Sequence, residues 1–473
     1  MKKRILAALA VLFLAWNVWA EGTAKYVFYF IGDGMGVNQV NGTETFLAAL
    51  DGRIGTRPLQ FAQFPNVALA TTFSATNGVT DSAAGGTALA TGKKTKNGVL
   101  GMLADQKTSI SSIAEQAKKS GKSVGIATSV SVDHATPASF YAHVPNRSLY
   151  YQIGKDLIRA GFDFYAGSDF LEPNDPKKKD TKDLYTACEE AGYTIARGYE
   201  DYQKKASDAA RMILFQTEKA SQKDRSRIPY AIDRTSEDLT LEQITQAGID
   251  FLSQNSPEGF FMMVEGGAID WACHANDAAT TFRETEDLDQ AIRVAYDFYK
   301  QHPDETLIVV TADHETGGIS LGTGAYEMHT QVLQYQKRSI SSYSAELSRL
   351  REQYKNQLTW DLVKENLKEN FGFWKEIQLS ENQTKKLKTA FEEMQKGIAT
   401  NSKTLYQNDE YLATVAKEII NSIARVGWQS GGHSNGYVPV FAIGCGASAF
   451  HGRIDNTYIP QLISKAAGYN PAN

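Results

Sequence analysis

The chain has 473 residues, of which 42% are hydrophobic and 22% are charged, and its formal net charge at pH 7 is −5. This length allows about two or three domains, or one large α/β unit with insertions. The basic residues do not form a patch or stripe along the sequence, so there is no reason to expect a nucleic-acid partner.

The first twenty residues have the pattern of a secretory signal. A basic start at residues 2–4 precedes a run from Ile5 to Trp19 that is apolar apart from Asn17, and Ala20 is a small residue at the expected cleavage point. The run is short for a membrane span. We therefore expect residues 1–20 to be removed, leaving a periplasmic or secreted protein with no stable membrane anchor.

The three cysteines, Cys188, Cys273 and Cys445, lie far apart in the sequence. Their odd number and wide spacing imply no disulfide framework, and an exported chain of this size does not need one. Cys273 adjoins a candidate metal ligand, but a small buried side chain is the simpler interpretation.

Apolar runs recur along the chain and predict strands. The first, from Tyr26 to Ile31, ends in G-D-G-M-G, which leaves Asp33 at the end of a buried strand. Helical patterns lie between the runs, most clearly from Thr281 to Tyr299. This alternation predicts an α/β fold with a large central, mostly parallel sheet flanked by helices on both faces. The other predicted strands are Asn66–Thr72, Ser123–Thr128, Phe162–Ala166, Met212–Phe215, Phe260–Glu265, Thr306–Thr311 and Val438–Ile443.

Residues 322–425 interrupt this alternation. The part from Ser339 to Asn401 is rich in Glu, Lys, Gln and Leu and has few strand signals, and sheet-like sequence resumes near Val438. We expect a mainly helical, crown-like insertion within one catalytic domain that covers residues 21–473. The insertion is open to two interpretations, a lid or partner surface and a solvated structural elaboration.

Ser82 is the candidate nucleophile. The stretch T-N-G-V-T-D-S-A-A-G-G-T, residues 76–87, places it where a strand pattern gives way to a helix pattern. A helix N-terminus offers free N–H groups and a positive dipole end to an anion such as phosphate. A plain N-cap explains the same Thr-Asp-Ser, so the interpretation depends on residues elsewhere in the chain.

Acids and histidines recur beside the predicted strands. Asp270 and His274 are four residues apart, the spacing that puts both on one face of a helix. Asp313 and His314 follow one predicted strand, and His433 precedes another. Because strand ends converge at one edge of a parallel sheet, these residues predict a multi-metal site. Its mixed nitrogen and oxygen ligands suit zinc, and its oxygen-rich part suits magnesium.

An ordered set of motifs resembles the alkaline phosphatase family: D-G-M-G, T-D-S-A-A, H-A-T-P with A-H-V-P-N-R, V-E-G with I-D and H, T-A-D-H-E-T-G-G, and G-G-H. The set spans nearly the whole chain after the signal, outside the insertions. The resemblance implies a phosphomonoesterase that uses two zinc ions and one magnesium ion. Members of the family are often dimers, so a homodimer is an expectation by analogy.

The resemblance also implies a role for each site residue. Ser82 would attack phosphorus and form a phosphoserine intermediate, while Arg147 would clamp two phosphate oxygens. His134 is a departure, because many bacterial relatives have aspartate there and lysine at the position of Trp271. We therefore expect the third metal site to hold magnesium more weakly or to admit zinc. The implied ligands are Asp270, His274 and His433 for one zinc, Asp33, Asp313, His314 and the Ser82 oxygen for the second, and Asp33, Thr136 and Glu265 for magnesium, with His134 at that third site.

Three alternatives remain beside the phosphomonoesterase. Phosphodiesterases of the same superfamily generally have threonine as the nucleophile, and sulfatases need a C/S-x-P-x-R segment. The S-A-A-G-G that begins at Ser82 fits neither pattern. The third alternative is a non-catalytic phosphate- or metal-binding protein on the same scaffold.

Overall fold

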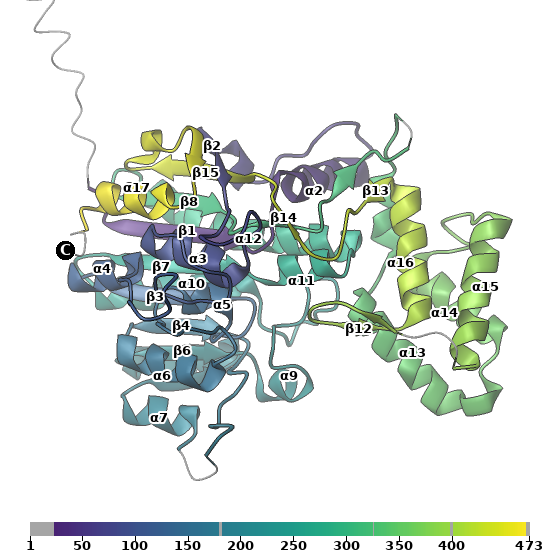
Figure 1. Ribbon diagram of the computed structural model, residues 1–473, viewed down its shortest axis with the longest axis horizontal. Coiled ribbons are helices and arrows are strands. Elements are labelled where there is room, and N and C mark those ends of the chain that lie inside the picture. The colour runs from purple at the N-terminus through teal and green to yellow at the C-terminus, as the bar shows by residue number, and fades with distance from the viewer. Residues whose placement is uncertain (1–22, 179–181, 325, 398–400, 470–473) are drawn as a thin grey trace, which may run out of the picture.

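The computed structural model of the protein describes residues 23–178, 182–324, 326–397 and 401–469, so the predicted signal at residues 1–20 lies outside the described residues. In the described chain, ten strands form one central sheet, and helices cover both of its faces (Figure 1). Across the sheet the order is β16-β2-β15-β8-β1-β7-β3-β4-β6-β5. These strands are β1 (Tyr26–Gly32), β2 (Asn66–Thr71), β3 (Ser123–Thr128), β4 (Phe164–Gly167), β5 (Thr194–Arg197), β6 (Met212–Phe215), β7 (Phe260–Gly266), β8 (Thr306–Thr311), β15 (Val438–Gly444) and β16 (Gly452–Asp455).

The helices fall between the strands and in the segment that precedes β15. Their bounds are α2 (Val37–Leu50), α3 (Ser82–Thr91), α4 (Ile113–Lys119), α5 (Ala135–Ala138), α6 (Tyr150–Ala160), α7 (Leu184–Glu190), α8 (Tyr199–Lys205), α9 (Glu218–Lys223), α10 (Leu241–Asn255), α11 (Ala268–His274), α12 (Ala278–Gln301), α13 (Ile340–Tyr354), α14 (Trp360–Phe371), α15 (Glu381–Gln395), α16 (Tyr411–Ala424) and α17 (Tyr458–Ala467). Nowhere in the described chain does a helix have both the length and the apolar character needed to cross a bilayer.

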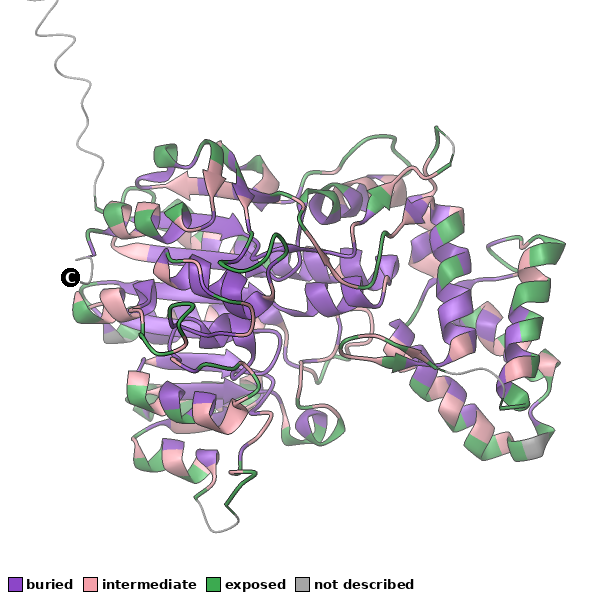
Figure 2. Ribbon diagram, in the orientation of Figure 1, coloured by how far each residue is buried: buried purple, intermediate pink, exposed green. Residues whose placement is uncertain are grey.

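The centre of the sheet is buried, as the purple strands in Figure 2 show. β1 lies between β7 and β8 and runs parallel to both. Only Tyr26, the first residue of β1, is partly exposed in these three strands. β15 is the exception to the parallel order, because it runs antiparallel to both β8 and β2. The prediction of an α/β fold with a large, mostly parallel sheet is confirmed.

The register of these strands brings three chain segments to one edge of the sheet. Near the end of β1, Ile31 pairs with Glu265 of β7 and with Thr311 of β8. Asp33 follows β1 and Asp313 follows β8, so both leave the sheet beside Glu265. Open α/β sheets bind their ligands at this carboxyl edge.

Two strands of the central sheet were not predicted from the sequence. β5 is an edge strand that pairs with β6, and β16 is the opposite edge, paired with β2. Both are mostly half-buried or exposed, so they lack the apolar runs that mark the central strands. The predicted helix from Thr281 starts earlier, at Ala278, because the Asp277 side chain caps it by accepting a hydrogen bond from the Thr280 N–H.

The chain between β10 (Ser320–Leu321) and β13 (Val426–Gly427) is mainly helical in its described residues. β10 and β13 pair antiparallel, so this segment leaves and rejoins the body of the protein at one place. It contains α13 to α16, whose buried apolar residues pack on one another, and a short hairpin made of β11 (Ser402–Lys403) and β12 (Asn408–Asp409). The hairpin points back toward α11 (Figure 1).

Helix α3 lies very close to the residues that follow β8. A Cβ atom placed on Gly85 would lie 2.9 Å from the carbonyl oxygen of Asp313, a distance that real Cβ atoms essentially never show. A glycine at this position therefore lets the helix approach the end of the strand.

Replacing Gly85 with alanine should destabilise the protein. Overpacking costs about 1–3 kcal/mol, which exceeds the gain of up to about 1 kcal/mol in helix propensity. The measurement is the midpoint of urea unfolding. Gly78→Ala is the matched control, because a Cβ there meets nothing within 4 Å, and its midpoint should not move. A Gly85→Ala midpoint equal to that of the wild type would show that α3 moves away without cost.

Candidate active site

Ser82 is the first residue of α3 and is fully buried. Asp81 is the N-cap, and its side chain accepts a hydrogen bond from the N–H of Ala84. The Ser82 Oγ lies 3.2 Å from Nε2 of His314. The same nitrogen lies 3.3 Å from a carboxylate oxygen of Asp33 and 3.3 Å from one of Asp313. Four potential ligand atoms, from two strand ends and one helix start, therefore converge on one point.

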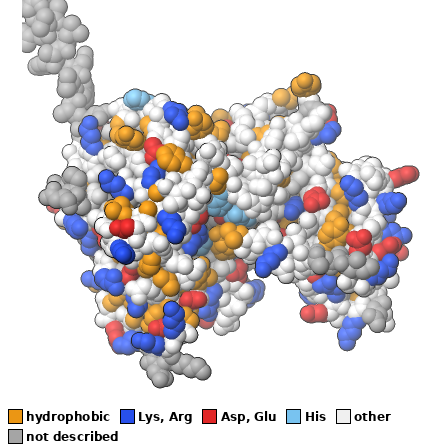
Figure 3. All heavy atoms as spheres, in the orientation of Figure 1, with side chains coloured by type: hydrophobic (Ala, Val, Ile, Leu, Met, Phe, Trp, Pro, Cys, Tyr) orange, Lys and Arg blue, Asp and Glu red, His pale blue; other side chains and the backbone are white. Residues whose placement is uncertain are grey.

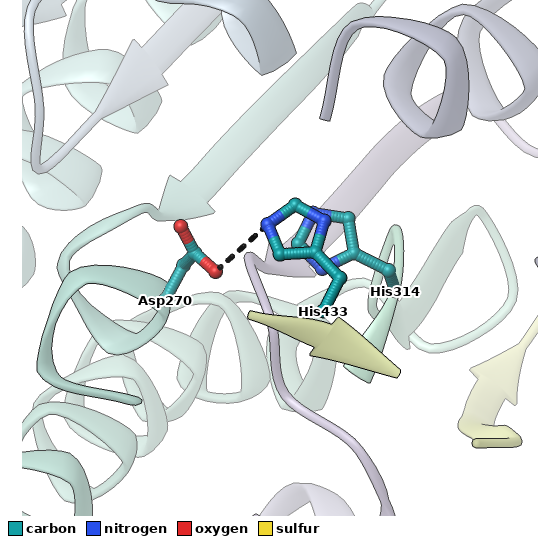
Figure 4. Close-up of side chains that lie close together, drawn as sticks. All are labelled: Asp270, His314 and His433. Atoms are coloured by element: carbon teal, nitrogen blue, oxygen red, sulfur yellow. Dashed lines mark ion pairs between the residues drawn. The ribbon is translucent and has the colours of Figure 1, made fainter. Parts of the chain in front are cut away.

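A second convergence joins the predicted residues Asp270, His274 and His433. Nε2 of His274 lies 3.2 Å from an Asp270 oxygen and 3.2 Å from Nε2 of His433. Figure 4 shows that His433 also stacks on His314, with ring centroids 3.7 Å apart, so the two groups adjoin. Histidine side chains are visible near the middle of the face in Figure 3, between the sheet body and the helical segment.

Backbone carbonyls fix the orientation of two of these imidazoles. Nδ1 of His274 donates to the carbonyl of Gly431 at 2.6 Å, and Nδ1 of His433 donates to the carbonyl of Thr80 at 2.8 Å. A carbonyl can only accept, so in the neutral rings the proton is on Nδ1 and the lone pair is on Nε2. The two Nε2 lone pairs then face each other, an arrangement that a cation between them would stabilise.

A third group contains Asp33, His134 and Glu265, whose candidate ligand atoms lie within 4.8 Å of one another. The Thr136 hydroxyl lies 3.4 Å from an Asp33 oxygen. The Thr128 hydroxyl donates a short hydrogen bond to one oxygen of Glu265, while the other oxygen has no hydrogen-bond partner among the described residues. The side chains predicted for the third site thus lie together, and one buried carboxylate oxygen among them has no hydrogen-bond partner in the described chain.

The electrostatics of the site fit metal ions. Asp33, Glu265, Asp270 and Asp313 are all fully buried. Burial, together with neighbouring negative charge, raises the pKa of Asp33 and of Asp313 well above the usual value, and burial raises that of Glu265 to about 7. Burial also lowers the pKa of His314 well below its usual value, which keeps the imidazole neutral and able to act as a ligand. Divalent cations would compensate this concentration of carboxylates.

Arg147 reaches the site from the loop before α6. Its Nη1 donates to Asp81 at 3.2 Å, and its Nη2 lies 3.3 Å from Nε2 of His134. Because guanidinium nitrogens only donate, Nε2 of His134 is the acceptor in this contact. Burial, with the charge of Arg147 as the next cause, lowers the pKa of His134 to about 3, so this ring is neutral.

Several residues that support the site were not predicted from the sequence. The Thr316 hydroxyl donates to Asp270 at 2.5 Å and lies 3.2 Å from Nδ1 of His314. Thr316 lies inside the T-A-D-H-E-T-G-G motif, so this motif could have indicated that Thr316 belongs to the site. Tyr406 stacks on Trp271 with ring centroids 4.3 Å apart, and nothing in the local sequence indicated this contact.

Comparison with known proteins gives a consistent result. The family model for alkaline phosphatase matches residues 24–469. Alkaline phosphatase 3 of Bacillus subtilis is 32% identical over 451 residues, which cover 94% of this chain and 89% of the relative.

Two solved structures have the same fold. A cold-active alkaline phosphatase from the psychrophile Shewanella sp. superimposes with a TM-score of 0.75 at 29% identity, covering 93% of this chain and 99% of the other. The second is a variant of the TAB5 alkaline phosphatase, described as carrying a histidine-to-aspartate replacement with Mg bound in its M3 site. It superimposes with a TM-score of 0.64 at 28% identity, covering 95% of this chain and 99% of the other. The chain therefore belongs to the alkaline phosphatase family and is a phosphomonoesterase.

Proposed function

We propose that the protein hydrolyses phosphate monoesters through a phosphoserine formed on Ser82, with two zinc ions and one magnesium ion as cofactors. The observation that carries this proposal is the position of the Ser82 Oγ, at the start of α3 and 3.2 Å from Nε2 of His314 among the converging carboxylates. A buried hydroxyl in this setting is placed to become a nucleophile.

The proposed ligands follow the three groups of side chains. When bound, divalent cations would supply the positive charge that stabilises the Ser82 oxygen, the phosphate oxygens and the departing oxygen. Magnesium at the M3 site of the TAB5 variant supports a third site in this chain as well. One zinc would take Asp270, His274 and His433, the second would take Asp33, Asp313, His314 and Ser82, and the third site would be formed by Asp33, Thr136 and Glu265 with His134 beside them.

The residues of the chain then divide the reaction into two steps. In the first, Ser82 Oγ forms a bond to phosphorus as the ester P–O bond breaks, and the alcohol leaves with a proton. In the second, water attacks phosphorus, phosphate leaves and the Ser82 hydroxyl is restored. Throughout, Arg147, held by Asp81, would donate two N–H groups to non-bridging oxygens. Two in-line displacements would retain configuration at phosphorus.

A panel of esters tests this function against its alternatives. Wild-type enzyme with its metals should hydrolyse p-nitrophenyl phosphate much faster than the bis-ester or the sulfate. Preference for the bis-ester would indicate a phosphodiesterase, and preference for the sulfate a sulfatase. Metal-replete protein that turns over none of the three would be a binding protein.

Export and assembly stay predictions. The periplasmic or secreted location depends on the signal pattern at residues 1–20, outside the described residues. A homodimer is proposed by analogy with the family alone, and the helical segment at 322–425 is proposed to be an insertion within the one catalytic domain.

Ser82→Ala should lower kcat by a factor on the order of 10³ or more, because the covalent route is lost. Zinc content, measured by elemental analysis, should stay close to the wild-type value. Ser112→Ala is the matched control, since Ser112 is also a buried serine at a helix start, and it should retain turnover. Near-normal turnover in Ser82→Ala would remove Ser82 as the nucleophile.

Arg147→Ala should weaken the binding of inorganic phosphate more than it changes metal content, because a guanidinium clamps anions and cannot ligate a cation. Calorimetric phosphate titration and metal analysis on the same sample measure both. Arg57→Ala, which removes an exposed arginine paired with Asp51, is the control. Loss of zinc with unchanged phosphate affinity would contradict the clamp.

The double variant His134→Asp with Trp271→Lys should bind magnesium more tightly and be inhibited more strongly by phosphate. Aspartate adds a hard oxygen ligand to the third site, and lysine adds a cation beside the phosphate. Titrating magnesium into metal-stripped wild type and variant measures the first effect, and the inhibition constant of phosphate measures the second. Equal magnesium affinity in the two proteins would show that His134 does not set the third site.

A further inference from the structure

Tyr406 is brought to the site by the hairpin of the helical segment. β11 and β12 pair antiparallel, and the N–H of Thr404 donates to the carbonyl of Gln407 at 2.9 Å, which closes the turn. Tyr406 lies in this turn, far in sequence from every other residue of the site. Figure 1 shows the hairpin extending from the helices toward α11, which carries Asp270 and His274.

One aromatic ring touches residues of two different metal-ligand groups. The Tyr406 ring stacks on that of Trp271, with an angle of 12° between the ring planes and 4.3 Å between the centroids. It meets the His274 and His134 rings edge-on, with centroid distances of 5.4 Å and 6.0 Å. Trp271 is only 5% exposed, and the hairpin is part of what covers it. Tyr406 is therefore a wall of the site.

The ring adjoins a metal-ligand group that does not contain Ser82. Ser82 lies beside His314, and in an in-line displacement the departing oxygen is on the opposite side of phosphorus. In the proposed function, the group of Asp270, His274 and His433 receives that oxygen, and Tyr406 contacts His274 there. Substrate atoms beyond the ester oxygen would then lie against the ring.

A separate cavity lies on the other side of this wall. It has a volume of about 340 Å³, and both Trp271 and Tyr406 line it. Its other walls come from the residues around Arg227, from α13 and from the hairpin itself. Removing the Tyr406 side chain would join this space to the catalytic groups, so the tyrosine limits the room for a leaving group.

The hairpin is anchored on the body of the protein and on the helices. The Gln407 side chain donates to the Tyr230 hydroxyl at 2.7 Å. Beyond the hairpin, the N–H of Glu410 donates to the Ser344 hydroxyl at 3.0 Å, and the Glu410 carboxylate forms a close ion pair with Arg351. These contacts fix the ring in place.

We propose that Tyr406 is a specificity-determining residue of the reaction. Its ring limits the size of the leaving group. This inference rests on the proposed function, because it takes Ser82 as the nucleophile and so fixes the side on which the alcohol leaves.

The test compares phenyl phosphate with 2-naphthyl phosphate, two aryl esters that differ by one fused ring. Tyr406→Ala should raise the ratio of kcat/KM for naphthyl over phenyl about tenfold relative to wild type. Tyr406→Phe keeps the ring and should leave this ratio within about twofold.

Leu405→Ala is the matched control, because Leu405 is in the same turn and is 65% exposed. It should leave the ratio unchanged, and thermal melting of all variants checks that they fold. An unchanged ratio in folded Tyr406→Ala would overturn the proposal. Wild type that hydrolyses neither aryl ester would overturn the proposed function instead.

Discussion

Four buried carboxylates meet at the carboxyl edge of one parallel sheet, and the rest of the structure is arranged around this concentration of negative charge. Burying an ionised carboxylate is expensive unless opposite charge accompanies it. Burial and neighbouring negative charge raise the pKa values of Asp33 and Asp313, and the charge of Arg147 opposes this only in part for Asp33. Cations bound among these carboxylates would compensate their charge, so metal binding should also contribute to the stability of the fold.

The sequence could predict the carboxylates and imidazoles because their signals are local. Asp33 and Asp313 each follow an uninterrupted apolar strand, and the four-residue spacing of Asp270 and His274 is helical. The parallel register that brings them together follows from the alternation of strands and helices. The edge strands β5 and β16 could not be found in this way, since partly exposed strands lack an apolar run.

The supporting residues depend on tertiary contacts, which sequence patterns do not show. Thr80 and Gly431 orient His433 and His274 through their backbone carbonyls. Because every residue has such a carbonyl, the residue types at these positions do not indicate this role. The helical segment stays open to both interpretations. Its helices bury apolar side chains among themselves, and its hairpin reaches the site through Tyr406.

The antiparallel pairing of β10 with β13 has a consequence for how this family can diversify. Leu321 and Val426 are direct partners, so the chain departs into the helical segment and returns through a narrow neck. On the side of the neck nearer the central sheet, β9 (Glu315–Thr316) pairs with β14 (His433–Ser434), and this pairing holds the His314 and His433 segments together. Helix α16 is also tied to the site, because the Lys417 side chain donates to the carbonyl of Ala275, next to His274. Since closing a longer loop between fixed ends costs little extra entropy, the outer loops of the segment can still change in length without moving the metal ligands.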